Sequence, residues 1–148
     1  MNIKELEPGE LEKAPVKKLL AGIPEFDRPY VTGDYLGRLS DRRHLILVAY
    51  DHELPVGFKI AYDRYGDGSL YSWMGGILKS HRRKKIAEKL AEYQQKWALS
   101  NGYDRIRMKT LNRHTGMLIF ALKDGFRITG FEAGTNPADS KIHLEKKL

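Results

Sequence analysis

One stretch of the sequence decides the fold: Ile77-Leu78-Lys79-Ser80-His81-Arg82-Arg83-Lys84-Lys85-Ile86-Ala87. It begins at the end of an apolar, strand-like run (residues 70–78) and opens directly into an amphipathic helix. The start of a helix exposes unpaired N–H groups and a partial positive charge, so clustered lysines and arginines are unfavourable there unless an anion lies between them. Phosphate is the usual ligand of such a strand–turn–helix junction. The stretch therefore predicts a phosphate site, with a solvated lysine-rich turn as the alternative.

The segments on either side of this turn form a β-α-β unit. The helix is predicted over Arg83 to Leu99, because its apolar residues recur at helical spacing. These residues form a single stripe: Ile86, Leu90, Tyr93 and Trp97. The next segment, Arg105 to Leu111, alternates as a strand does. It should pair in parallel with the strand Leu70 to Leu78, through a right-handed crossover.

Further segments extend the sheet on both sides of this unit. Additional strands are predicted over Ile3 to Leu6, His44 to Tyr50, Val56 to Tyr62, Phe126 to Phe131 and Ile142 to Leu144. Additional helices are predicted over Leu11 to Gly22, Asp34 to Arg42 and Asn112 to Asp124. Because proline is favoured in the first turn of a helix, a start of the first helix at Pro15 is the alternative. Gly75-Gly76 interrupts the third long strand, which indicates a bulge or a simple kink. This order predicts one α/β domain on a mixed sheet, covering residues 1–148.

The composition excludes several kinds of chemistry. The 148 residues include no cysteine, which excludes disulfides, thiolate metal sites and a cysteine nucleophile. The five histidines are scattered without the spacing of metal ligands, so no metal site is expected. The N-terminal residues do not read as a signal peptide, and no apolar run is long enough to cross a membrane. A cytoplasmic protein without a membrane partner is therefore expected.

The charge of the chain points to anionic partners. Its formal net charge of +7 favours nucleotides, phosphorylated cofactors or nucleic acid, without choosing among them. Nucleic acid is the weaker choice, because no recognition motif or set of stacking aromatics accompanies the basic residues.

In the order of its elements and in its basic turn, the chain resembles the GCN5-related N-acetyltransferase (GNAT) family over nearly its whole length. The family signature is Gln/Arg-x-x-Gly-x-Gly/Ala after the fourth strand, and the matching residues here are Arg82-Arg83-Lys84-Lys85-Ile86-Ala87. Lys85 replaces the middle glycine, which in the family lets the backbone approach the cofactor. A second segment, residues 112–126, is similar to the family's other cofactor segment. There an asparagine follows the fifth strand and the helix ends in a Lys-x-Gly-Phe turn.

The resemblance implies a fold and a cofactor. The fold is α/β, with a mixed, mostly antiparallel sheet of six to seven strands that is splayed between the fourth and fifth strands and has helices on both faces. The cofactor is acetyl-CoA, as co-substrate. Its pyrophosphate is expected to bind main-chain N–H groups of residues 83–88, with Arg82 and Lys84 as nearby charges. Its pantetheine arm is expected to pair with the main chain of residues 77–79. The implied cofactor-binding residues are Ile77, Leu78, Lys79, Arg82, Arg83, Lys84, Lys85, Ile86, Ala87, Glu88 and Asn112, of which Asn112 is also a candidate N-cap of the helix after it.

The resemblance also implies transfer of an acetyl group to a primary amine by direct attack on the thioester, with a backbone N–H near Ile77 stabilising the oxyanion. Many members carry a carboxylate on the fourth strand and a tyrosine in the last helix to handle protons. Here the strand offers no carboxylate, and the tyrosine position is Ala121, beside Phe120. Tyr71 is the catalytic candidate. Deprotonation of the amine by water is an alternative. Other conceivable bases are Glu53, Asp63 and His114, each of which also reads as a surface or packing residue.

The acceptor is expected to be a small-molecule or peptide amine. The acceptor pocket should be lined by the two N-terminal helices, the loop that connects them and the strand after Gly130. Its expected aromatic entrance comprises Phe26, Tyr30, Tyr35 and Trp73. A non-catalytic protein of the same fold, which binds CoA or a partner, is the alternative function. A homodimer stays open, since many family members dimerise.

Overall fold

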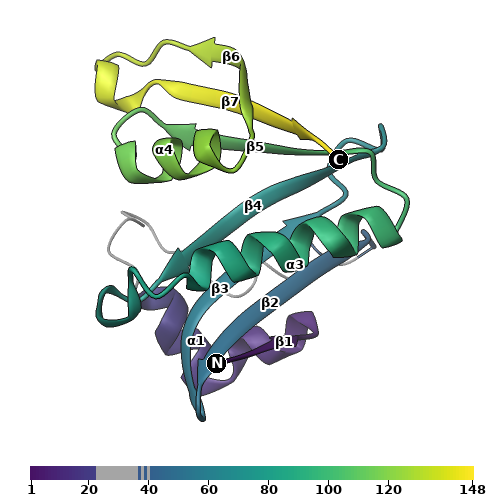
Figure 1. Cartoon of the computed structure of the whole chain (residues 1–148), viewed down its shortest axis with the longest axis vertical. Coiled ribbons are helices and arrows are strands. Elements are labelled where there is room, and N and C mark those ends of the chain that lie inside the picture. Colours follow the sequence, from purple (N-terminus) through teal and green to yellow (C-terminus); the bar gives the residue numbers. More distant parts are fainter. Residues whose placement is uncertain (23–36, 38, 40) are drawn as a thin grey trace.

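A seven-stranded mixed sheet runs through the computed structural model, which describes residues 1–22, 37, 39 and 41–148 (Figure 1). The strand order is β1-β2-β3-β4-β5-β7-β6. All neighbouring strands are antiparallel except β4 and β5, which are parallel. The strands are β1 Asn2–Glu5, β2 His44–Asp51, β3 Leu54–Tyr62, β4 Ser69–Ile77, β5 Arg105–Leu111, β6 Arg127–Glu132 and β7 Lys141–Lys147. The predicted mixed sheet and its parallel pair are thus confirmed.

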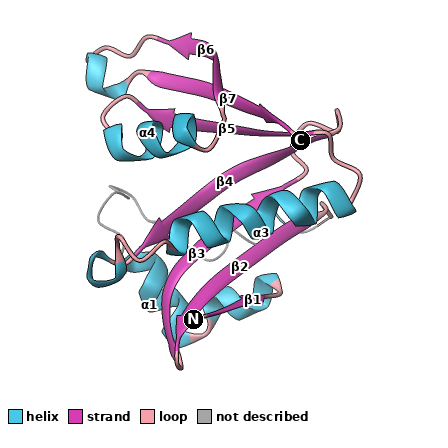
Figure 2. Ribbon diagram, in the orientation of Figure 1, coloured by secondary structure: helices cyan, strands magenta, loops and turns pink. Residues whose placement is uncertain are grey.

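Helices cover both faces of the sheet (Figure 2). The α-helices are α1 Ala14–Ala21, α3 Ile86–Ser100 and α4 Thr115–Lys123. The short 3-10 helices are η1 Pro8–Glu12, η2 Lys79–His81 and η3 Pro137–Asp139. Strand β2 shows why the central strands read as unbroken apolar runs. Its Ile46 and Val48 pack with α1, whereas Leu45 and Leu47 pack with α3. Because side chains of a strand alternate between faces, a strand buried on both faces must be apolar throughout.

Three helices begin or lie differently from the prediction. The first α-helix starts at Ala14, after the turn η1, so the alternative start with Pro15 in the first turn is confirmed and the start at Leu11 is wrong. Helix α3 starts at Ile86 rather than Arg83, because Arg83 and Lys85 adopt positive φ angles of 63° and 62° that no α-helix contains. Helix α4 starts at Thr115, with His114 as its N-cap, so Asn112 is not the cap. Most of the predicted helix 34–42 lies outside the described residues.

The parallel strands β4 and β5 are paired over only part of their length. The pairs run from Ser69–Arg105 to Ser72–Met108, whereas β4 continues to Ile77. The two strands lie together near the C-terminus of the chain and diverge away from it (Figure 1). The predicted splay between the fourth and fifth strands is therefore present.

The irregularity that accompanies the splay is not where it was predicted. Ile60 faces Met74 and Ala61 faces Ser72, so the extra residue of β4 is Trp73 and not the pair Gly75-Gly76. The two glycines continue regular pairing with β3. A Cβ atom at Gly75 would lie 3.3 Å from the Phe58 carbonyl oxygen, so this glycine allows close approach of the neighbouring strand.

No helix in the described part of the chain is both long and apolar enough to span a membrane.

Candidate functional site

A cleft of about 930 Å³ occupies the space where β4 and β5 diverge. Residues 72–77 of β4 form one wall and residues 108–111 of β5 form the opposite wall. The turn before α3 and the first turns of α4 close its ends. The cleft is bounded mainly by apolar side chains and main-chain groups, as is usual for sites that bind small molecules and cofactors.

The turn before α3, residues 82–88, has the main-chain geometry of an anion site. The first hydrogen bond at the start of α3 is donated by the Lys89 N–H to the Lys85 carbonyl oxygen, and the side chain of the N-cap residue Lys85 forms no capping hydrogen bond. Within the described residues, the N–H groups of residues 83–88 therefore have no hydrogen-bond partner. Arg83 and Lys85 have positive φ angles, whereas Lys84 between them does not. Such alternation of left-handed residues with others is the backbone pattern of an anion-binding nest. We call residues 83–88 the anion turn.

Neighbouring groups hold the anion turn in place. His81 Nε2 lies 2.9 Å from Asp51 Oδ2 at the end of β2, and His81 Nδ1 lies 2.8 Å from the Ser80 hydroxyl. The hydrogen bond with His81 lowers the pKa of Asp51. The Arg82 guanidinium donates to the Ile77 carbonyl oxygen at 3.2 Å. These contacts join the turn to β2 and β4 and leave its main-chain donors open.

The register of β3 and β4 decides which main-chain groups face the cleft. The Leu78 N–H donates to Val56, and the Leu78 carbonyl accepts from His81, so both groups are already used. In an antiparallel ladder, alternate residues direct their N–H and C=O groups toward the other neighbour. Ile77 and Gly75 therefore direct theirs toward the gap that β5 leaves.

The cofactor residues predicted from the sequence fall into two groups. Those that line the cleft are Ile77, Arg82, Arg83, Lys85, Ala87 and Glu88. Ile86 is buried in the core under α3, although its N–H belongs to the anion turn. Leu78, Lys79 and Lys84 do not line the cleft. Asn112 does not either, because its side chain donates to the Pro137 carbonyl oxygen at 3.2 Å and its N–H donates to Ser140.

Several residues of the cleft were not predicted from the sequence, and Lys59 is one of them. Lys59 of β3 pairs with Gly75, points to the α3 face of the sheet and lines the cleft. Burial lowers the pKa of Lys59 to about 8. The sequence feature that could have revealed Lys59 is its place within an apolar strand. Residues 58 and 60 belong to one buried face of β3, and Lys59 falls on the other face, where a charged side chain is unusual.

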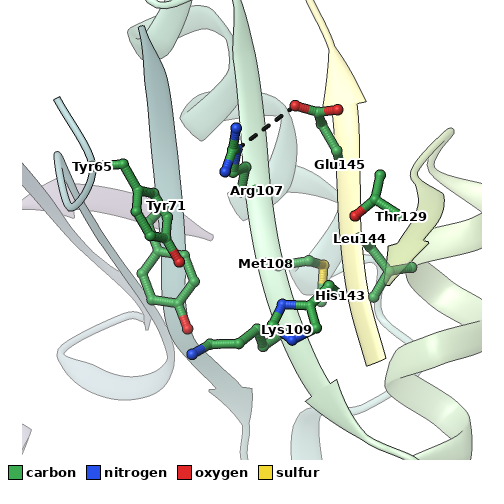
Figure 3. Close-up of a pocket in the computed structure, with 9 residues that line it drawn as sticks. All are labelled: Tyr65, Tyr71, Arg107, Met108, Lys109, Thr129, His143, Leu144 and Glu145. Carbon is green, nitrogen blue, oxygen red and sulfur yellow. Dashed lines mark ion pairs between the residues drawn. The ribbon is translucent and has the colours of Figure 1, made fainter. Parts of the chain in front are cut away.

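A second, smaller cavity of about 180 Å³ lies on the opposite face of β5 (Figure 3). Tyr65 and Tyr71 lie on one side of it, and Arg107 and Lys109 project from β5. The other lining residues are Met108, Thr129, His143, Leu144 and Glu145. Met108 and Lys109 also line the cleft, so the two cavities adjoin at the place where the β4–β5 pairing ends.

Charge in this second cavity is largely compensated. Arg107 lies 3.0 Å from Asp67 and 3.7 Å from Glu145. The Lys109 ammonium lies 5.7 Å from the centre of the Tyr71 ring. Burial raises the pKa of Tyr71 to about 12, so its phenol stays protonated at neutral pH and donates hydrogen bonds. Tyr71 therefore suits a positioning role better than that of a base.

Of the other catalytic candidates, one lines the cleft and two lie outside both cavities. His114 lines the cleft as the N-cap of α4. Glu53 lies in the exposed turn between β2 and β3, and neither cavity includes it. Asp63 accepts hydrogen bonds from the Tyr103 hydroxyl and the Gly66 N–H, and so has a structural role. Of the expected aromatic entrance, Trp73 lines the cleft, whereas Phe26, Tyr30 and Tyr35 lie outside the described residues.

Across the described ranges 1–22, 37, 39 and 41–148, no group of three or more His, Cys, Asp or Glu side chains is arranged to hold a metal ion.

Comparison with known proteins places this geometry in a family. The model of the acetyltransferase (GNAT) family matches residues 13–126. No curated protein sequence matches the chain significantly. Among solved structures, an aminoglycoside 6′-acetyltransferase type Ii has a TM-score of 0.82 at 23% identity, covering 99% of this chain and 97% of that one. The ribosomal-protein-S18-alanine N-acetyltransferase of Escherichia coli has a TM-score of 0.82 at 11% identity, with 99% and 92% covered. An aminoglycoside 6′-N-acetyltransferase complexed with coenzyme A has a TM-score of 0.76 at 21% identity, with 99% and 97% covered.

Proposed function

The chain belongs to the GNAT acetyltransferase family, and we propose that it is an acetyl-CoA-dependent N-acetyltransferase that acetylates a primary amine by direct attack on the thioester. The observation that carries the proposal is the anion turn. Its N–H groups have no partner within the described residues, and several residues of the turn line a cleft of about 930 Å³.

The anion turn fits a pyrophosphate. The N–H groups of residues 83–88 supply donors, and the N-terminus of α3 adds its partial positive charge. The basic residues that line the cleft at or beside this turn are Arg82, Arg83 and Lys85. Among the described residues, Glu88 is the one acidic residue that lines this cleft, and its N–H is among the donors.

The wall formed by β4 fits the pantetheine arm. The main-chain groups of Ile77 and Gly75 point into the gap, so an extended amide chain can pair with them as a strand would. The Ile77 carbonyl is partly used by Arg82, which leaves its N–H as the free group. In this reading the thioester lies beyond Ile77, toward Ser72, and a β4 N–H stabilises the oxyanion.

The second cavity fits the acceptor. It adjoins the cleft at Met108 and Lys109, on the opposite face of the sheet, so an amine bound there reaches the thioester without displacing the cofactor arm. Tyr71 and Arg107 are placed to orient the acceptor through hydrogen bonds. The acceptor is a small-molecule or peptide amine.

Thermal unfolding with and without acetyl-CoA tests the cofactor assignment. A ligand that binds only the folded protein raises its melting temperature, by an amount that grows with the ratio of ligand concentration to Kd. We expect a clear rise at millimolar acetyl-CoA. No rise for normally folded protein would refute the proposed function.

A non-catalytic protein that binds CoA or a partner is the second candidate. It is favoured by the lack of a carboxylate among residues 71–74 of β4 and by Ala121, which is 1% exposed at the position expected for a tyrosine. Incubation of acetyl-CoA with polyamines, amino acids, aminoglycosides and peptides separates the two. Release of free thiol that depends on an amine supports the enzyme, whereas cofactor binding without any release supports the second candidate.

A further inference from the structure

Lys59 lines the cleft but has no role in the contacts proposed above for the cofactor and the acceptor. It projects from β3 across Gly75, and a Cβ atom at Gly75 would lie 3.7 Å from the Lys59 Cγ. Any larger residue at position 75 would therefore compete with the lysine stem for this space. The glycine lets Lys59 cross β4 and line the cleft between the anion turn and the point where β4 and β5 meet.

The Lys59 ammonium is poorly compensated for a half-buried charge. In the part of the chain that the structure describes, it forms no hydrogen bond or ion pair. Asp124 at the end of α4 partly restores its pKa, but that carboxylate also accepts hydrogen bonds from Gln95 and Lys146. A charge kept in such a place without a partner costs stability, which suggests a role in binding or chemistry.

The other ionisable groups of the cleft lie elsewhere along it. Those around the anion turn are His81, Arg82, Arg83, Lys85 and Glu88. Those near the start of α4 and the nearby edge of the sheet are Lys109, Arg113, His114 and Lys141. On α3, Gln94 is buried and neutral, and its Oε1 has no partner within the described residues.

We propose that Lys59 contacts the sulfur of the bound cofactor and gives it a proton as the thioester breaks. This inference rests on the proposed function. The acceptor nitrogen forms a bond to the carbonyl carbon, the carbon–sulfur bond breaks, and its electron pair leaves with sulfur. The Lys59 ammonium transfers one proton to that sulfur, which gives free CoA thiol and a neutral lysine. The acceptor releases its own extra proton to water, and Lys59 regains a proton from solvent after CoA leaves.

Two features of the structure make Lys59 suitable for this step. Burial brings its pKa to about 8, close to that of an alkyl thiol, so proton transfer to the departing sulfur is nearly balanced in energy. Ala121 is small and buried, so α4 supplies no phenol at the position where the family often has a tyrosine. Lys59 reaches the same cleft from β3 instead.

The direct test measures the ionisation of the CoA thiol on the protein. The chain contains no cysteine, so CoA is the only thiol in the complex. The ultraviolet absorbance of its thiolate is followed against pH, with the acetyl-CoA complex as the blank. We expect the bound thiol to have a pKa at least about one unit below that of free CoA, because a cation touches the sulfur. In Lys59→Met this shift should disappear, whereas in Lys59→Arg it should remain.

Turnover against pH separates proton donation from charge alone. In the wild type, kcat/KM should fall as pH rises through about 8, where Lys59 loses its proton. Lys59→Met should turn over about 100-fold more slowly and lose this descending limb. Lys59→Arg should be equally slow, because arginine does not give up its proton. Lys96→Met on the exposed side of α3 is the matched control and should behave as wild type.

The outcomes distinguish this role from the proposed function. If CoA binds with an unshifted thiol pKa in folded wild-type protein, or if Lys59→Met keeps the descending limb, the role of Lys59 is overturned while the cofactor site stands. If Lys59→Arg keeps full turnover, proton donation is overturned. If CoA does not bind at all, the proposed function fails and this inference fails with it.

Discussion

The two ends of the cleft are built from different parts of the chain. The anion turn offers main-chain N–H groups, which every residue except proline possesses, so its function depends on backbone shape more than on side-chain identity. The inner end and the adjoining cavity offer particular side chains, including Lys59, Tyr71 and Arg107. The first end can therefore serve a cofactor shared across a whole family, whereas the second can differ with the acceptor and with the way protons are handled.

This difference predicts which substitutions act on which end. A change at the anion turn should act on acetyl-CoA affinity and leave the chemical step alone. A change at the inner end should act on turnover or on the acceptor and leave acetyl-CoA affinity alone.

The largest effect is expected for a negative charge placed in the anion turn. Ala87→Glu adds a carboxylate in the first turn of α3, beside the proposed pyrophosphate site. Repulsion between close like charges at a partly solvated site amounts to a few kcal/mol, so the Kd for acetyl-CoA should rise about 100-fold or more. Isothermal titration calorimetry measures it. Leu99→Glu adds the same charge at the far, exposed end of α3 and should leave Kd nearly unchanged. Equal effects of the two variants would show that the turn is not the phosphate site.

A smaller effect, on the other end only, is expected for Tyr71→Phe. The phenol is protonated at neutral pH because burial raises its pKa to about 12, so its loss removes a hydrogen-bond donor and not a base. The KM for the acceptor should rise about tenfold, as for one lost hydrogen bond, while the Kd for acetyl-CoA stays the same. The shape of the rate profile between about pH 6 and about pH 9 should not change. Loss of one limb of that profile would instead identify Tyr71 as the base.

The support of the anion turn is predicted to matter less than the turn itself. Asp51→Asn removes the carboxylate that pairs with His81 and should raise the Kd for acetyl-CoA about threefold near pH 7, since a partly exposed pair contributes little.

The same variant should also change the dependence of stability on pH. The pKa of Asp51 is lowered in the folded state, so the contribution of this carboxylate to stability is present above the ordinary aspartate pKa and is lost as pH falls through the lowered value. The difference between variant and wild type in thermal stability should therefore shrink on acidification below about pH 4. A difference that is constant with pH would exclude the ion pair as its cause.

The two ends also differ in how well they could be predicted from the sequence. The anion turn is a local pattern, because its charges, the preceding strand and the following helix are contiguous. The left-handed angles at Arg83 and Lys85 were missed, since positive φ at residues with side chains is uncommon and no local residue type signals it. Lys59 reads in isolation as a solvent-facing residue of a strand. Only the pairing with Gly75, contributed by the next strand, turns it into a residue of the cleft.

The second cavity was still harder to predict, because the sheet order brings its walls together. β7 inserts between β5 and β6, which places His143 and Glu145 beside Arg107. The separation between these residues along the chain gives no sign of that contact. The sequence alone therefore predicted the fold and the place of the basic turn before α3, whereas it did not predict which residues line the second cavity.

The smallest effect is expected for Lys85→Gly, which restores the residue that the family signature has at this position. Lys85 has a φ of 62°, a left-handed angle that costs a residue with a side chain about 1 kcal/mol. Glycine removes this strain but gains freedom in the unfolded chain, so the free energy of unfolding should change by less than about 1 kcal/mol. The main-chain donors are the same in both proteins, so the Kd for acetyl-CoA should stay within about threefold of the wild-type value or decrease. Calorimetry measures this Kd. Lys84→Gly is the control, because Lys84 does not line the cleft. A large loss of affinity in Lys85→Gly alone would mean that the lysine charge holds the phosphate, and the distinction between a main-chain end and a side-chain end would then fail.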